Sequence, residues 1–358
     1  MINLAIVGLG KFGRRHVDAA IASGRFRVVR AVVRNKAPAE AFAAARSIAL
    51  STDLAETLAD PGVDAVSLVT PHSQHVAQII QAAAARKHVL AEKPFTLTKA
   101  EAERAIEACA KAGVVVAVGH DNRFYSVITE IKRLLQTGTL GTILHVEANL
   151  SHNAGQQARY LESPPPAASF AALTDAVTIQ KSGPGAWRLD RSEGPAGPIT
   201  HLRIHRIDSF VQLFGRIDEV FAHASRGTLN LPVPISVAVM VRFRSGMTGY
   251  LGSSQLTPLN SRMQIFGTKA WLEASGAHDI QEYQRSSLRS VSVRLNDGGF
   301  EKRKIDAVDS VMLNLEAFAD AIEGKSPYPV PADEIIQVVA VMEAVVQSLA
   351  TGHPVSVT

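Results

Sequence analysis

Short apolar runs alternate with stretches of helical spacing over the first third of the chain. The runs at 4–7, 28–33, 65–69, 88–91 and 114–118 have the length and composition of strands buried on both faces. Helices are expected between them, ending at residue 22 and then over 38–46, 53–58, 73–86 and 98–112. Strands and helices that alternate in this way form parallel sheets with right-handed crossovers. The sequence therefore predicts an α/β fold with a doubly wound parallel sheet in a domain over residues 1–122.

The remainder, residues 123–358, has a different pattern. Apolar runs separated by turn residues fill the stretch from 217 to about 305, as in an antiparallel sheet. We expect a second domain with a mostly antiparallel sheet, whose C-terminal helices are able to pack back on the first domain. Its expected elements are helices at 124–136, 198–214, 310–323 and 332–350 and strands at 143–150, 235–243, 249–255 and 263–266.

The composition excludes several classes of protein. The 37 Lys and Arg against 33 Asp and Glu leave a net charge of 37 − 33 = +4, without a basic block that would bind nucleic acid. A single cysteine excludes a disulfide scaffold and a multi-cysteine metal site. No apolar run approaches the ~18 residues of a membrane span, and the N-terminus lacks an export signal. We expect a cytoplasmic protein without nucleic-acid or membrane partners.

A glycine motif, G-L-G-K-F-G at 8–13, directly follows the first strand and opens the first helix. In this context Gly8 permits the turn, Gly10 lets the backbone approach a pyrophosphate, and Gly13 allows close packing of helix on strand. The helix N-terminus supplies free N–H groups and the positive end of its dipole. The alternative is a purely structural turn. The expected phosphate-binding residues are Gly8, Gly10, Lys11, Phe12 and Gly13.

The end of the second strand indicates which dinucleotide binds. NAD sites usually carry an acidic residue there, which holds the ribose 2′-OH. This chain instead has Arg34, Asn35 and Lys36, and the next carboxylate, Glu40, lies inside the following helix. Arg34 with Asn35 or Lys36 suits a 2′-phosphate, and the alternative is a solvated basic loop. We predict NADP as the preferred cofactor, with NAD as the alternative.

Two further motifs follow parallel strands, at the edge of the sheet where ligands bind in such folds. One contains Thr70, Pro71, His72 and His75, and the other is Glu92-Lys93-Pro94. Together with the glycine loop they resemble the Gfo/Idh/MocA oxidoreductase family, whose usual patterns are P-N-x-x-H and E-K-P. His72 stands where Asn is more usual. The resemblance continues through 118–124, 140–141, 187–188, 317–319 and 351–355, and so spans nearly the whole chain.

The resemblance implies an N-terminal Rossmann domain followed by a C-terminal α/β domain with a large, mostly antiparallel open sheet. It also implies hydride transfer between a nicotinamide and a sugar or polyol, in a homodimer or homotetramer. It implies that Lys93 lies near both nicotinamide and substrate, where its ammonium could bind the reacting oxygen. Arg188 matches a position close to cofactor and substrate, and Asp121 is a further candidate for substrate contact. The residues expected at the cofactor beyond the glycine loop are Arg34, Asn35, Thr70, Pro71, His72, His75, Glu92 and Lys93.

The second-domain helix at 198–214 departs from the family pattern, which is D-x-x-x-H with a further Asp three residues later. His205 matches the histidine and Asp208 the later Asp, a substrate candidate, whereas His201 replaces the first Asp. Arg203 stands where Gly is common. The positions 201, 205, 208 and 212 form one stripe, beside an apolar stripe at 204, 207, 211 and 214, as in the wall of a cleft.

Three interpretations of this helix are open. In the first, His205 takes the hydroxyl proton and His201 positions substrate or shares that proton, so that the two imidazoles titrate as a pair. In the second, the missing Asp marks altered or lost catalysis. In the third, His201, His205 and Asp208 bind a metal, although no other signature supports one; we expect no metal.

The sequence thus predicts an NADP-preferring oxidoreductase acting on a hydroxylated small molecule, with Lys93, His205 and His201 as the catalytic residues. The alternatives are a dinucleotide-binding regulator without turnover and a glycosidase that uses its nicotinamide in a redox cycle. Other histidines are expected to be structural: His16 on a helix surface and His88 at a strand end. The identity of the substrate is not specified by any motif.

Overall fold

The computed structural model describes residues 1–151, 158–160, 177–179, 190, 192–197, 199–225, 234–254, 257–276 and 288–358. For 158–160, 177–179, 201 and 202 it describes the backbone alone. The chain forms two compact units. One comprises Met1–Phe124 and Asp309–Val339, and the other Tyr125–Val308 and Ala340–Thr358. The functional domains predicted at 1–122 and 123–358 stay a prediction. The first compact unit differs from the first predicted domain by including a segment near the C-terminus, Asp309–Val339.

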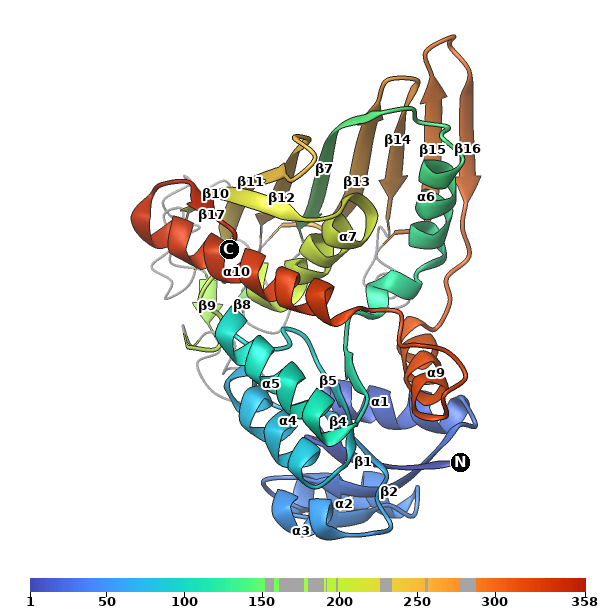
Figure 1. Ribbon diagram of the computed structural model, residues 1–358, viewed down its shortest axis with the longest axis vertical. Coiled ribbons are helices and arrows are strands. Elements are labelled where there is room, and N and C mark those ends of the chain that lie inside the picture. Colours follow the sequence, from blue (N-terminus) through green and yellow to red (C-terminus); the bar gives the residue numbers. More distant parts are fainter. Residues whose placement is uncertain are drawn as a thin grey trace. The chain divides into compact units, whose positions relative to one another are not determined.

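The first unit contains a six-stranded parallel sheet in the order β3-β2-β1-β4-β5-β6. Figure 1 labels four of its strands, β1, β2, β4 and β5. Dinucleotide-binding folds have this strand order, with the ligand at the carboxyl ends of the strands. The predicted α/β class is confirmed. The strands are β1 (Ile2–Val7), β2 (Phe26–Val32), β3 (Ala49–Ser51), β4 (Ala65–Leu68), β5 (His88–Ala91) and β6 (Val116–Val118). The helices are α1 (Lys11–Ala22), α2 (Glu40–Ala44), α3 (Leu54–Ala59), α4 (His75–Ala84), α5 (Lys99–Ala112) and α9 (Ser310–Ile322).

Two of these elements differ from the prediction. The edge strand β3 was not predicted, because its three residues are too few to show an alternation of polar and apolar side chains. The helix expected at 38–46 is shorter: a 3₁₀ turn at Ala37–Ala39 precedes α2, and Ser47 has a positive φ of 55° just beyond it. A left-handed residue cannot continue a right-handed helix.

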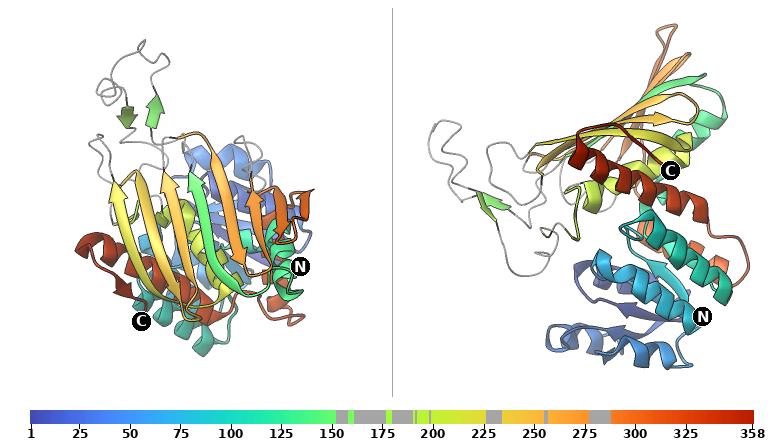
Figure 2. Two further views of the ribbon diagram at one scale, coloured as in Figure 1. Left: turned by 90° about the horizontal axis from the view of Figure 1, so that it is seen from above. Right: turned by 60° about the vertical axis from the view of Figure 1, so that its left-hand side comes forward.

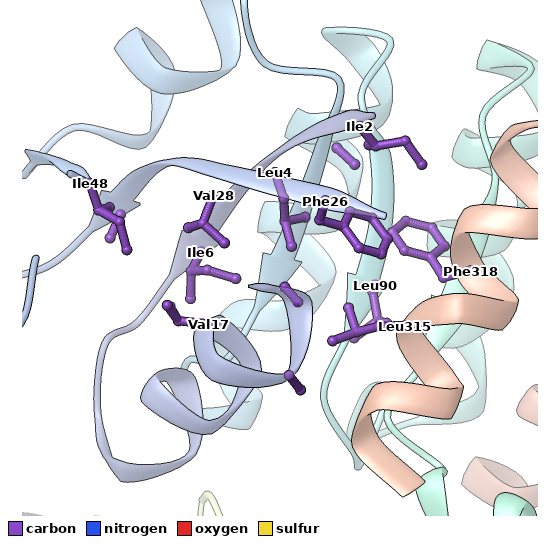
Figure 3. Close-up of a cluster of buried hydrophobic side chains, with 14 of the residues drawn as sticks. Ile2, Leu4, Ile6, Val17, Phe26, Val28, Ile48, Leu90, Leu315 and Phe318 are labelled. Carbon is purple, nitrogen blue, oxygen red and sulfur yellow. The ribbon is translucent and has the colours of Figure 1, made fainter. Parts of the chain in front are cut away.

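The core of the first unit includes side chains from α9, far along the sequence (Figure 3). Phe318 stacks on Phe26 of β2 with the ring centroids 6.3 Å apart. Asn314 Nδ2 and the Tyr328 hydroxyl both donate to the carbonyl oxygen of Val118, at 3.1 and 2.8 Å. The segment 309–339 therefore completes this unit, covering its core and binding the end of the edge strand β6.

The second unit is built on a nine-stranded sheet in the order β16-β15-β14-β13-β7-β12-β11-β10-β17. Its neighbouring strands are antiparallel except for the parallel pair β7–β12, which confirms the predicted mostly antiparallel sheet. The strands are β7 (Ile143–Ser151), β10 (Ile217–Ser225), β11 (Ser236–Phe243), β12 (Thr248–Ser254), β13 (Asn260–Gly267), β14 (Ala270–Ser275), β15 (Ser290–Leu295), β16 (Phe300–Lys304) and β17 (Val355–Ser356). A separate pair, β8 (Ala158–Tyr160) and β9 (Val177–Ile179), is antiparallel.

Helices α6 (Ser126–Gln136) and α7 (Ile204–Phe214) lie on one face of this sheet (Figure 2). Burial alternates along the strands accordingly: in β11, Val237, Val239 and Val241 are buried and Met240 between them is 51% exposed. In the described part of the second unit, no helix lies on the opposite face (Figure 2). Strands with one packed and one open face show this period of two.

The last helix, α10 (Ala332–Thr351), is long and apolar enough by length and composition to cross a membrane. Asp333, Glu334 and Glu343 interrupt its apolar residues, so this helix is not the continuous apolar run that the sequence analysis found to be missing. In addition, 56% of its most apolar window is buried inside the protein, and Ser348 on this helix accepts the N–H of Ala222 in β10 at 2.9 Å. The core helix of a soluble protein has the same length and composition, so the feature is weak evidence for a membrane span.

Candidate functional site

The glycine loop between β1 and α1 has the predicted geometry. Gly8 has a φ of +97°, and a Cβ there would lie 2.4 Å from the carbonyl oxygen of Val69. A Cβ on Gly13 would lie 1.9 Å from the carbonyl oxygen of Gly8, so helix and loop pack without room for a side chain. At Gly10, by contrast, no described atom lies within 4 Å of the Cβ position. The loop is thus closed on the protein side and open where a pyrophosphate would approach.

The first turn of α1 begins at Lys11 and carries no acidic side chain. Its N–H groups have no acceptor within the helix, and the positive end of the dipole points the same way. Phe12, in the same turn, remains 38% exposed. The chemistry of this loop fits the phosphates of a dinucleotide.

Exchange of the two glycines for alanine is expected to have opposite effects. Gly13→Ala forces α1 away from Gly8, and overpacking of this kind costs about 1–3 kcal/mol, so its melting temperature falls. Gly10→Ala, in open space, keeps the wild-type melting temperature but places a methyl group where the phosphates approach. Thermal unfolding and fluorescence titration with NADPH measure the two effects. A Gly10→Ala variant that binds NADPH as the wild type does would contradict the assignment.

The loop after β2 is basic and exposed at Arg34, Asn35 and Lys36. The side-chain oxygen of Asn35 accepts the N–H of Ala37 at 3.1 Å, which orders the turn. Arg14, on α1, donates to the carbonyl oxygen of Pro38 at 2.8 Å. Cations from two elements therefore lie at this loop, as a 2′-phosphate would require.

His75 connects the loops that follow β4 and β5. Its ring is fully buried, with Nδ1 2.9 Å from the carbonyl oxygen of Pro94 and Nε2 3.1 Å from that of Thr70. Burial lowers the pKa of His75, although both carbonyl groups favour its protonated form. His72 is also buried and meets His75 edge-on at 5.9 Å. Since both nitrogens of His75 are engaged within the chain, this geometry supports a positioning role rather than direct contact with a cofactor.

Thr70 and Pro71 lie directly after β4. The Thr70 hydroxyl donates to Gln78 Oε1 on α4 at 2.6 Å, and both Thr70 and Pro71 are half-buried. Pro71 precedes the 3₁₀ turn His72–Gln74 that leads into α4. These predicted residues thus lie at the carboxyl edge of the sheet, as expected.

Glu92, directly after β5, is a buried carboxylate in a hydrogen-bonded chain. Its Oε1 is 3.1 Å from Nε2 of His16, and Nδ1 of His16 is 2.8 Å from the Ser67 hydroxyl on β4. Oε2 of Glu92 accepts the N–H of Lys93 at 3.3 Å. A Cβ on Gly119 would lie 2.3 Å from the Glu92 carboxylate, so the absence of a side chain there makes room for it.

The charge state of Glu92 follows from these neighbours. Burial alone would raise its pKa, but the hydrogen bond with His16 and the charges of His16 and Lys93 outweigh that effect and lower the pKa. Glu92 is therefore an anion in a buried position, next to the half-buried Lys93.

Asp121, which follows β6, is the second acid of this region. Ser310, at the start of α9, donates to its Oδ2 at 2.7 Å. Burial raises the pKa of Asp121 to about 6, and the charge of Glu92 adds to the rise. The Ser310 hydrogen bond and the charges of Lys93 and His16 oppose it. His16, Glu92 and Lys93 of the same unit thus all act on the pKa of Asp121.

The raised pKa of Asp121 predicts a pH dependence of stability. Between pH 3.8, its ordinary pKa, and about 6, the folded protein binds more protons at this group than the unfolded chain does. Stability should therefore fall as pH rises through this window. Asp121→Asn keeps an acceptor for Ser310 and removes the titration, so its unfolding free energy lacks this fall. Urea unfolding of both proteins at several pH values measures the difference, and parallel curves would contradict the assignment.

The predicted helix at 198–214 begins as a π-helical turn, Ile199–Arg203, before α7. Arg203 is fully buried, and its guanidinium donates to the carbonyl oxygens of Leu150 at 2.5 Å and Ser254 at 3.3 Å, at the ends of the parallel strands β7 and β12. Arg203 therefore joins the helix to the sheet. Single π turns are frequent at functional sites.

His205 and Asp208 both lie in α7, with 9% and 0% of their surface exposed. The whole stretch Ile204–Val211 is buried, so its members of the polar stripe and of the apolar stripe both face protein. A fully buried Asp208 supports a positioning role rather than contact with substrate. The side chain of His201 and all of Arg188 lie outside the described residues.

Comparison with known proteins identifies the family. Residues 2–120 match the sequence model described as the oxidoreductase family with an NAD-binding Rossmann fold. Residues 128–273 match the model of the GFO/IDH/MocA C-terminal domain. The chain belongs to the Gfo/Idh/MocA family of oxidoreductases. The resemblance inferred from the glycine loop and the Glu92-Lys93-Pro94 motif is confirmed.

Several Gfo/Idh/MocA relatives align over the full length. A 1,5-anhydro-D-fructose reductase of Ensifer adhaerens is 27% identical, over 97% of this chain and 96% of the relative. A D-xylose 1-dehydrogenase (NADP⁺) of Haloferax volcanii is 25% identical over 98% of both chains. The crystal structure of an oxidoreductase-family protein from Desulfitobacterium hafniense has the same fold, with a TM-score of 0.85, 23% identity, and coverage of 99% of this chain and 97% of that one.

Sequence reasoning missed three residues of this Gfo/Idh/MocA site: His16, Ser67 and Ser310. His16 was expected on the helix surface, which is wrong, since it is 2% exposed. The signal was present, because Gly13, Val17 and Ala20 share its face of α1 and are buried. His88 does begin β5, as expected, where its Nδ1 accepts the N–H of Val115.

The described side chains contain no group of three or more His, Cys, Asp or Glu placed to hold a metal ion. The metal interpretation of the helix at 198–214 depends on His201, whose side chain lies outside that set.

Proposed function

We propose that this family member is an NADP-preferring oxidoreductase acting on a sugar, polyol or related hydroxylated small molecule. The observation that carries the proposal is the glycine loop, which is closed at Gly8 and Gly13 and open at Gly10. This loop lies at the same edge of the sheet as Lys93 and the buried carboxylate of Glu92. The names of two full-length relatives, a sugar dehydrogenase and an anhydrosugar reductase, support the substrate class.

The roles of the residues follow from their chemistry. A bound nicotinamide supplies the exchange of a hydride with the substrate carbon. Lys93 donates a hydrogen bond to the reacting oxygen, where a fixed cation favours developing negative charge. His205 accepts the hydroxyl proton during oxidation and returns it during reduction. His201 positions substrate or shares that proton, while Asp208 holds α7 in place.

The NADP preference rests on Arg34 and on the absence of a carboxylate among residues 33–39. Fluorescence titration should give tighter binding of NADPH than of NADH. Arg34→Ala should weaken NADPH binding by about tenfold or more, the worth of a charge-assisted hydrogen bond, and leave NADH binding nearly unchanged. Tighter binding of NADH by the wild type would contradict the proposed preference.

A panel of sugars and polyols, monitored by nicotinamide absorbance, tests the reaction itself. An oxidoreductase changes the absorbance in proportion to product. A redox-cycling glycosidase releases sugar without net change, and a regulator binds NADPH but does neither. Either of the last two results would reject the proposed function.

We further propose that the protein is cytoplasmic and forms a homodimer or homotetramer through the open face of its nine-stranded sheet. That face carries Met240, Tyr250, Phe266 and Trp271, which alternate with buried neighbours along their strands. Light scattering should give two or four times the chain mass of 38.3 kDa. A mass of one chain would reject this assembly.

A further inference from the structure

Three hydrogen-bonded side chains, those of His16, Ser67 and Glu92, are here called the His16 relay. Its three side chains come from α1, β4 and the loop after β5, and each is under 10% exposed. The imidazole joins the other two through hydrogen bonds of 2.8 and 3.1 Å. Burying a carboxylate is costly unless it is paired and hydrogen-bonded, and His16 with the Lys93 N–H supplies both conditions for Glu92.

The relay satisfies its hydrogen bonds in two protonation states. When the imidazole is neutral with its proton on Nε2, it donates to Glu92 and accepts at Nδ1 from the Ser67 hydroxyl. When a proton is added at Nδ1, the Ser67 hydroxyl rotates and accepts instead, because a hydroxyl is both donor and acceptor. The relay can therefore take up or release one proton without losing either hydrogen bond.

The relay is connected to the residues that the proposed function uses. Glu92 accepts the backbone N–H of Lys93, and the charge of Lys93 acts on Glu92 in turn. On its other side, the ring of His16 packs against Phe12 with the centroids 5.2 Å apart. Phe12 lies within the glycine motif, so the relay is located directly behind the loop assigned to the dinucleotide.

We propose that the His16 relay is a positioning device that holds Lys93 by the negative charge of Glu92 and releases that hold when His16 takes up a proton. The proposal rests on the proposed function. With a neutral His16, the hydrogen bond from its Nε2 and the charge of Lys93 keep Glu92 ionised, and Lys93 is the cation that pairs with it. A protonated His16 also favours the ionised Glu92, but its own positive charge then competes with Lys93 for the carboxylate. Among the described groups, Asp121 also interacts electrostatically with this cluster, and it accepts a hydrogen bond from Ser310 of α9.

The main test is the pH profile of kcat/KM for three proteins. The wild type should lose activity on the acidic side as His16 becomes protonated. His16→Gln presents an amide donor and acceptor that never titrate, so this acidic loss should disappear while most activity at neutral pH remains. Asp121→Asn should keep it. An acidic loss that persists in His16→Gln, or that disappears only in Asp121→Asn, would overturn the proposal.

Further variants separate positioning from folding. Glu92→Gln should lower kcat about tenfold or more, as expected for loss of a charge-assisted interaction, with KM for the substrate little changed. His16→Ala should be less active than His16→Gln, because only glutamine replaces both hydrogen bonds. The matched control is His88→Gln, at the opposite end of β5, which should keep the wild-type pH profile. Equal activity of His16→Ala and His16→Gln would reject the relay.

A readout without turnover keeps this proposal separate from the proposed function. In imidazole ¹⁵N spectra, the His16 Nε2 proton should exchange slowly with water in the wild type and at least about tenfold faster in Glu92→Gln, which lacks the charged acceptor. Unchanged exchange would overturn the relay even if an oxidoreductase activity is found. If no substrate turns over while exchange responds as expected, the proposed function fails and the relay remains.

Discussion

Replacing Lys93 by methionine is expected to lower kcat by about 10²–10³-fold, the usual loss when one donor to a developing oxyanion is removed. Methionine keeps most of the length and the apolar character of the lysine stem, so the loop after β5 should hold its shape. Binding of NADPH should therefore stay close to that of the wild type. Steady-state kinetics with the best substrate of the panel, together with fluorescence titration, measure both quantities.

The control for this variant is Lys111→Met. Lys111 lies on α5 in the same unit, and its side chain is 73% exposed and paired with Glu107 one turn away. Its loss should leave turnover unchanged. If Lys93→Met turned over substrate as fast as Lys111→Met does, Lys93 would not bind the reacting oxygen.

Replacing His205 by asparagine should lower kcat by about 10²–10⁴-fold, the range for a lost general acid–base group. Asparagine retains a polar side chain of similar reach but cannot exchange a proton near neutral pH. Because His205 lies within the buried stretch of α7, the melting temperature must be measured beside the kinetics.

His223→Asn is the matched control for His205→Asn. His223 lies on β10 of the same unit and is exposed, so both stability and turnover should stay at wild-type values. A His205→Asn protein that is folded and fully active would show that another group takes the proton. A folded but inactive His205→Asn protein would show that His205 takes part in turnover, although this chain has His201 where the family usually has Asp.

The parts of the site that follow strands were predictable from sequence, because a strand followed by a motif fixes the position of that motif in a parallel sheet. The glycine loop and the Glu92-Lys93-Pro94 motif are of this kind. In such cases the chain neighbours determine the geometry. Strand β5 was predicted with the bounds that the structure has, His88–Ala91.

The remaining parts depend on partners distant in sequence, which a local pattern does not contain. Ser310 reaches Asp121 across 189 positions, and Arg206, placed on a helix beside apolar residues, is buried and donates to Ser261 on β13. The π turn at Ile199–Arg203 leaves no trace in residue spacing, because it differs from an α-helix only in its hydrogen-bond partners. Local periodicity therefore indicates elements, but not the pairs that they form.

The return of residues 309–339 to the first unit has a consequence for how the protein is made. When the ribosome has released the first 124 residues, the ring of Phe26 has no Phe318 to stack on, and the carbonyl oxygen of Val118 lacks both of its side-chain donors. The first unit therefore has an uncovered patch of core until most of the chain has been synthesised. Expression of residues 1–124 alone should accordingly yield an aggregation-prone fragment, and a fragment library for this protein should never be cut on the assumption that its first domain is contiguous.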